Sequence, residues 1–180
     1  YFTGRLPSDP LGRLFSTVDY SRRIVFFFFF DALKAIDQIT LIHKTVEKNR
    51  GSSIPMWAYR DVLYMLIDYS IRAFEIIERK LTDEEKKEVY DVFYRMGSRM
   101  NINDLPVTYS DWLLSRGQHL TQDLAWSDYT LDLFKQYKLH LGRWRYFILL
   151  QSQSMVLPEI VKDHLHLKGI LWIKPAFSLY

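Results

Sequence analysis

Four polar side chains near the start of the chain have types and spacing that suit a ligand site: Arg13, Ser16, Thr17 and His43. The first three stand at i, i+3 and i+4, so on a helix they share one face and can contact one ligand. His43 falls in a stretch whose apolar residues recur at helical spacing, which places its imidazole on the face that should point toward the core. The pattern predicts a polar site in apolar surroundings. The alternative interpretation is a core histidine that is hydrogen-bonded to a backbone carbonyl.

These residues resemble a known motif. The segment 12–17, Gly-Arg-Leu-Phe-Ser-Thr, followed by His43, is similar to the haem signature of the MpaB-like oxygenases, a family that includes the latex-clearing rubber oxygenases. In that family an Arg-x-x-Lys-Thr motif precedes a histidine by about one helix. The segments 9–14, 67–75, 81–85 and 96–106 also resemble the family, in the same order. The resemblance covers most of the first two thirds of the sequence.

The resemblance implies a haem b oxygenase that uses dioxygen on an apolar substrate, such as an isoprenoid or lipid-like compound. It implies that His43 is the axial iron ligand and that Arg13 and Thr17 shape the pocket as catalytic residues. Arg13 would contact a haem propionate or the distal pocket, and Thr17 would hydrogen-bond to dioxygen or a propionate. Ser16 stands where the family has lysine, so we expect the sixth iron position to be vacant or filled by water. Without haem, Arg13 would form a surface ion pair and Thr17 would bond to a carbonyl one turn earlier.

Two departures from the family leave a second function open. Ser16 replaces the signature lysine, and the interval from Thr17 to His43 is a few residues shorter than in the family. Five phenylalanines also run directly into Asp31, so either a loop is shortened or residues are absent after Phe30. The alternative function is a non-enzymatic helical protein of the same fold that binds a lipid or a protein partner.

Composition excludes several other classes. The 24 Lys and Arg are interspersed with 21 Asp and Glu, whereas a nucleic-acid binder would show a concentrated basic stripe. The absence of cysteine excludes disulfides, thiolate-ligated haem and iron–sulfur clusters. No apolar stretch approaches the ~20 residues that cross a bilayer. We therefore expect a cytoplasmic protein, with peripheral membrane contact through the tail around Trp172 as a weaker hypothesis.

The periodicity predicts an all-α, single-domain, multi-helix bundle around a buried cofactor pocket, spanning 1–180 with some upstream residues absent. Thr82 and Glu85 form a capping box, and Gly142 should break or kink a long helix. The expected helices begin after residue 9 and run toward 30, then cover 31–48, 55–79, 82–100, a stretch from 108, 128–141, 143–156 and 159–168.

The helix over 55–79 is the most apolar, yet it carries Asp68, Arg72 and Glu75 at i, i+4 and i+7. Charges on such a helix are costly unless they are paired, so we expect an internal ion network there, with a site role as the minority interpretation. The remaining histidines lack the spacing of a metal site and are expected at the surface: His119, His140, His164 and His166.

Overall fold

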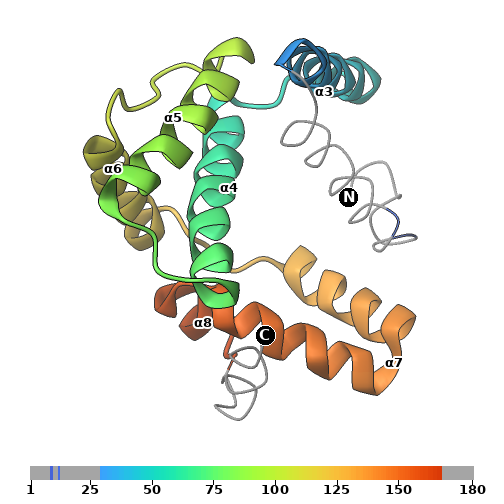
Figure 1. Ribbon diagram of the computed structural model, residues 1–180. Coiled ribbons are helices and arrows are strands. Elements are labelled where there is room, and N and C mark those ends of the chain that lie inside the picture. Colours follow the sequence, from blue (N-terminus) through green and yellow to red (C-terminus); the bar gives the residue numbers. More distant parts are fainter. Residues whose placement is uncertain (1–8, 10–11, 13–28, 168–180) are drawn as a thin grey trace.

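The computed structural model describes residues 9, 12 and 29–167. This part of the chain contains six helices and no strand (Figure 1), which confirms the all-α, single-domain prediction. The buried cofactor pocket stays a prediction. The helix expected before residue 30 and the tail around Trp172 lie outside the described residues. The helices are α3 (Phe29–Arg50), α4 (Met56–Ile77), α5 (Asp83–Arg99), α6 (Tyr109–Gln122), α7 (Asp128–Val156) and α8 (Glu159–His164).

Helix α4 lies at the centre of the core, which agrees with its being the most apolar of the expected helices. Its buried residues Leu63, Tyr64, Ile67 and Ile71 pack with side chains from α5, α6 and the loop between them. The central aromatic contact is the stack of Tyr109 on Trp112, with ring centroids 5.5 Å apart. The remaining core members are Tyr90, Ile102 and Trp112. This core is filled by rings and branched aliphatic chains that pack directly on one another.

Capping residues start the helices where the sequence placed them. The Thr82 hydroxyl accepts from the backbone N–H of Glu85, and the Glu85 carboxylate accepts from the backbone N–H of Thr82. Thr108 caps α6 and Ser127 caps α7 in the same way, each accepting from a backbone N–H within its first turn. These bonds satisfy N–H groups that a helix cannot satisfy itself.

Helix α3 lies at the edge of this core. Its Ile36 is buried, and the face that includes Ile39 and His43 is half-buried. Asp37 accepts two hydrogen bonds from Arg99 of α5, at 2.8 and 2.7 Å, which joins α3 to α5. The helix therefore presents its histidine-bearing face inward, as its periodicity predicted.

Helix α7 has two halves. Gly142 adopts φ 70° and ψ 177°, a conformation that is essentially restricted to glycine, so the helix turns there instead of continuing. The two halves run beside one another, and the turn that joins them lies away from α4, α5 and α6 (Figure 1). Helix α8 is shorter than the predicted 159–168 and ends at His164. Among the described residues, no helix is long and apolar enough to cross a bilayer.

Candidate functional site

The structure places one of the four predicted site residues. His43 lies on α3, whereas Arg13, Ser16 and Thr17 lie outside the described residues, so their approach to His43 stays a prediction. The His43 side chain is half-buried, and its Nδ1 atom is shielded from solvent. The imidazole edge meets the ring of Tyr59 from α4, with centroids 5.2 Å apart and planes at 75°. His43 is thus held at the junction of α3 and α4.

Tyr59 is itself held from α3. Its hydroxyl donates to Glu47 Oε1 at 3.4 Å, and the same oxygen accepts from the backbone N–H of Ile54 at 2.7 Å. Burial, and then the nearby Glu47 carboxylate, raise the pKa of Tyr59 above its ordinary value. Tyr59 therefore remains a neutral donor at neutral pH, and the loop between α3 and α4 fixes the ring against which His43 packs.

This environment suits a histidine that ligates a metal centre through Nε2. Such histidines keep Nδ1 within the protein, where neighbouring groups fix the ring orientation, and direct Nε2 at the metal. The shielded Nδ1 and the edge contact with Tyr59 meet the first of these two conditions. Among the described residues, no group of three His, Asp or Glu side chains could hold a metal ion by itself. A single-histidine ligand set is the pattern of a haem, whose porphyrin supplies the other four donors.

A second polar site lies between α4 and α6. It is a cavity of about 700 Å³, and each helix contributes residues at i, i+3, i+4 and i+7, which share one face. The contributing positions are Trp57, Arg60, Asp61 and Tyr64 on α4, and Ser115, Gln118, His119 and Gln122 on α6, with 123–125 completing the wall. The facing hydroxyls of Tyr64 and Ser115 are 3.0 Å apart.

His119 lies in this cavity between two carboxylates, so the prediction of a surface histidine is wrong. Its Nε2 is 2.5 Å from Asp61 Oδ1, its Nδ1 is 3.0 Å from Asp123 Oδ2, and its side chain is 16% exposed. The matching helical spacing on α4 and α6 was the available signal in the sequence. The other three histidines are exposed as predicted: His140, His164 and His166.

The expected internal ion network is present around Asp68. Its carboxylate is 2.6 Å from Arg72 Nε and 3.3 Å from Arg116 Nε, and Arg116 is 7% exposed. Arg116 also approaches Asp61 at 3.7 Å, which connects this network with the His119 cluster. The residues Asp68 and Arg72 therefore have the structural role that the apolar surroundings predicted.

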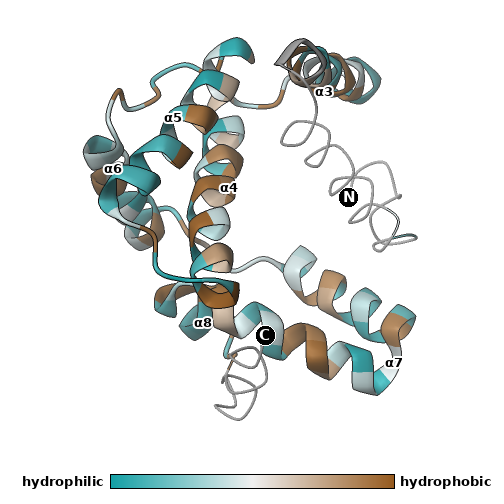
Figure 2. Cartoon of the chain, viewed as in Figure 1, coloured by the Kyte–Doolittle hydropathy of each residue, from teal (hydrophilic) through white to brown (hydrophobic). Residues whose placement is uncertain are grey.

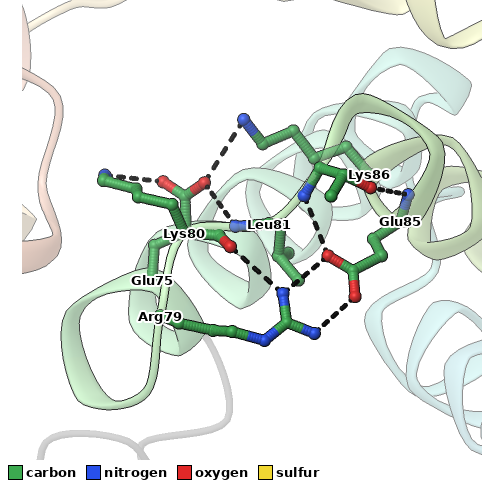
Figure 3. Close-up of polar contacts among 7 residues, drawn as sticks. Glu75, Arg79, Lys80, Leu81, Glu85 and Lys86 are labelled. Carbon is green, nitrogen blue, oxygen red and sulfur yellow. Dashed lines mark hydrogen bonds and ion pairs between the residues drawn. The ribbon is translucent and has the colours of Figure 1, made fainter.

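Glu75 belongs to a separate network at the corner between α4 and α5 (Figure 3). It pairs with Lys80 at 2.9 Å and Lys86 at 3.2 Å, and it accepts from the backbone N–H of Leu81. Burial raises the pKa of Glu75, but the hydrogen bonds from Lys80, Lys86 and Leu81 outweigh it, so the net pKa is lowered. The i, i+4, i+7 spacing therefore did not place Glu75 in the same network as Asp68.

Comparison with known proteins identifies the family. Residues 2–168 match the family described as "ER-bound oxygenase mpaB/B'/Rubber oxygenase, catalytic domain". No curated protein and no solved structure matches the sequence. The matched range includes all four predicted site residues and extends past the end of α8. The chain is thus a member of the mpaB and rubber oxygenase catalytic-domain family.

Proposed function

We propose that this protein is a haem b-dependent oxygenase that uses dioxygen on an apolar substrate, such as an isoprenoid or lipid-like compound. The observation that carries the proposal is His43: within a chain of this oxygenase family, it lies on the inward face of α3 with Nδ1 shielded from solvent. Its imidazole has the chemistry of an axial haem ligand. No thiolate competes, because the chain has no cysteine.

In this proposal His43 holds the iron through Nε2, and Tyr59 keeps the imidazole plane fixed. The T-shaped contact limits rotation of the ring, and the hydrogen bond from Tyr59 to Glu47 limits movement of Tyr59. A fixed ring orientation places Nε2 without further reorganisation when the cofactor binds. The haem supplies the activation of dioxygen, while the protein supplies binding, orientation and exclusion of water.

The remaining roles come from residues 13–17. The Arg13 guanidinium suits a propionate or a polar position in the pocket, and the Thr17 hydroxyl can donate a hydrogen bond beside the cofactor. A serine hydroxyl is a poor iron ligand, so Ser16 would not bind the iron as the family's lysine can. The haem would then be accessible to dioxygen. These roles are assigned by the family signature, from which the sequence departs at Ser16 and in the interval from Thr17 to His43.

A second candidate function is a non-enzymatic protein of this fold that binds a lipid or a protein partner. The specific observations in its favour are Ser16 in the place of the signature lysine and the short interval from Thr17 to His43. A shortened interval would change the direction from which the histidine approaches the signature helix. Haem binding separates the two candidates, because the non-enzymatic alternative does not require it.

The test is a haem titration of the purified chain, followed by its visible absorption spectrum. We expect a Soret band that saturates at one haem per chain and that His43→Ala abolishes or shifts. His140→Ala is the matched control, because His140 is exposed and its Nδ1 bonds to the Gln136 carbonyl of its own helix. A folded protein that binds no haem would exclude the oxygenase proposal and leave the non-enzymatic candidate.

A second variant tests the role of Ser16. Ser16→Lys restores the family residue, so we expect the spectrum to change from an open or water-ligated ferric form to a six-coordinate form with a nitrogen ligand. An unchanged spectrum in a variant that still binds haem would show that Ser16 does not face the iron. Once haem binding is established, dioxygen consumption with isoprenoid and fatty-acyl compounds distinguishes the substrate classes.

A further inference from the structure

The turn of α7 forms a projecting tip, which we define as residues 138–148. Gly142 reverses the chain there, so the end of the first half and the start of the second half lie at one extremity. In Figure 1 this turn is far from the core helices α4, α5 and α6. The tip is therefore convex, and it can insert into another surface without disturbing the core.

The tip exposes large apolar side chains on both sides of the turn. Trp144 is 82% exposed and Leu139 is 75% exposed, and Phe147 and Ile148 are also exposed. Figure 2 shows hydrophobic and hydrophilic segments next to one another at this end of α7. A concentration of exposed large apolar residues at one place marks an interaction site, unlike single apolar residues scattered over a surface.

The charges at the tip have one sign. Lys138, Arg143 and Arg145 are exposed, and none of them forms an ion pair within the part of the chain that the structure describes. The sequence contains no Asp or Glu from 133 to 158. Elsewhere the basic residues are interspersed with acidic ones, so this segment differs from the rest of the chain in its charge pattern. Its partner should be apolar and anionic.

We propose that the α7 tip docks on the surface of an anionic lipid bilayer, with Trp144 and Leu139 entering the boundary between headgroups and acyl chains. Tryptophan is enriched at that depth because its ring is amphipathic. Arg143 and Arg145 flank Trp144 in the sequence, so their guanidinium groups can remain among the lipid phosphates while the indole enters. The contact is peripheral, because no described helix can cross a bilayer.

A bilayer fits these features better than a protein groove does. A protein partner would need a concave acidic surface that matches a projecting tip, whereas a bilayer interface accepts a convex apolar tip and supplies negative charge along its whole surface. The proposal does not depend on haem, because the tip lies on α7 and the candidate ligand His43 lies on α3. Lipid binding and haem binding can therefore succeed or fail independently.

The test is co-sedimentation of the full chain with phosphatidylcholine vesicles, with and without added phosphatidylserine. We expect binding to the anionic vesicles that weakens as salt is added. Trp144→Ala should weaken it by at least about tenfold, because a large apolar side chain no longer enters the boundary. Replacing both Arg143 and Arg145 with Gln should weaken it roughly 25-fold, since each basic residue near such a surface contributes about 1 kcal/mol.

Matched controls distinguish the loss of the tip contact from a general loss of exposed apolar surface or positive charge. Trp57→Ala removes an exposed tryptophan on α4, and the pair Lys87→Gln and Arg95→Gln removes two exposed charges on α5. These controls should bind as the wild type does, and every variant should keep the wild-type thermal unfolding profile.

Three results would overturn the proposal. The first is equal binding to neutral and anionic vesicles, and the second is undiminished binding by either tip variant. The third is no vesicle binding together with a change in oligomeric state caused by Trp144→Ala, which would assign the tip to a protein contact.

Discussion

Asp68 is the carboxylate at which two arginines from different helices meet. Arg72 reaches it along α4, and Arg116 reaches it from α6 with a side chain that is 7% exposed. A buried guanidinium is costly when its partner is lost, because it keeps its charge at any accessible pH. The ion pair between Asp68 and Arg116 therefore constrains how α4 and α6 pack, whatever its net contribution to stability.

Replacing Asp68 with Asn should destabilise the protein by about 3 kcal/mol, because Arg116 would keep only the longer contact with Asp61. Chemical denaturation of the wild type and the variant measures the difference. Asp37→Asn is the matched control: it also removes a carboxylate from an interhelical pair with arginine, but that pair is at the surface and should contribute about 0–1 kcal/mol. Equal decreases in the free energy of unfolding of the two variants would contradict the structural role of Asp68.

Gly97 permits close packing between α5 and its neighbours. A Cβ atom at this position would lie 2.6 Å from Leu63 Cδ2 and 2.8 Å from Leu105 Cδ1. Leu63 is buried in the core, where it packs with the other members of the buried cluster. The glycine is therefore required by tertiary packing and not by its backbone conformation.

We expect Gly97→Ala to lower the free energy of unfolding by about 1–2 kcal/mol, because overpacking outweighs the gain in helix propensity. Gly117→Ala provides the control, since a Cβ there would meet no atom within 4 Å and the residue lies within α6. The free energy of unfolding of that variant should be higher than that of the wild type by up to about 1 kcal/mol. Both are measured by thermal unfolding, and a stabilised Gly97→Ala would refute the packing argument.

At the scale of elements, the corner between α4 and α5 is fixed by charged side chains. Arg79 donates to both carboxylate oxygens of Glu85, at 2.8 and 2.5 Å, and Glu85 also accepts from the backbone N–H of Thr82 (Figure 3). The hydrogen bonds from Arg79, followed by the backbone bond from Thr82, lower the pKa of Glu85 from 4.5 to about 2. One carboxylate thus completes a capping box and holds the preceding turn.

This lowered pKa predicts a pH dependence of stability. A carboxyl group whose pKa is lower in the folded state stabilises the fold above its unfolded pKa, and this contribution is lost as the pH falls through the folded value. Glu85→Gln keeps a side chain that can complete the capping box but removes the charge. The stability difference between wild type and variant should be largest above pH 4.5 and should vanish near pH 2.

Urea denaturation at a series of pH values measures this difference. The pair is exposed, so the effect should be small and should decrease with salt. Glu84→Gln is the control, because Glu84 lies in the same first turn and forms no ion pair among the residues that the structure describes. A wild-type advantage over Glu85→Gln that stays constant between pH 5 and about 2 would contradict the assignment.

At the scale of the whole molecule, the core is concentrated in α4, α5 and α6. The buried cluster comes from these three helices and the 100–108 loop, while α3 contributes Ala35 and Ile36 at its edge. The tip of α7 contributes no buried residue. Stability should therefore be uneven along the chain, because local opening costs least where the fewest apolar contacts are lost.

Hydrogen exchange should follow this gradient. We expect amides around Ile67 and Tyr90 to exchange only through global unfolding, while amides at the α7 tip exchange through local opening, orders of magnitude faster. Mass spectrometry of peptides from α4, α5 and α7 in the same sample gives an internal comparison. Equal protection at the tip and around Ile67 would show that the α7 hairpin belongs to the same cooperative unit as the core.

The sequence by itself determined the order of the described helices and the caps at which α5, α6 and α7 begin. The caps at Thr82, Thr108 and Ser127 and the turn at Gly142 were all predictable, because each depends on hydrogen bonds or backbone conformation within a few residues. The inward face of α3, with His43 on it, followed from 3.6-residue periodicity for the same reason. The family signature supplied the interpretation of His43, which periodicity alone left open.

Only the tertiary structure decided which helical faces meet. The pairing of Asp37 with Arg99 joins residues 62 positions apart, and the contact of His119 with Asp61 joins α6 to α4. Spacing placed these side chains on faces of their own helices but did not specify which other helix each face would contact. That choice depends on how side chains of separate helices interlock across the whole core, and no local hydrogen-bond pattern encodes it.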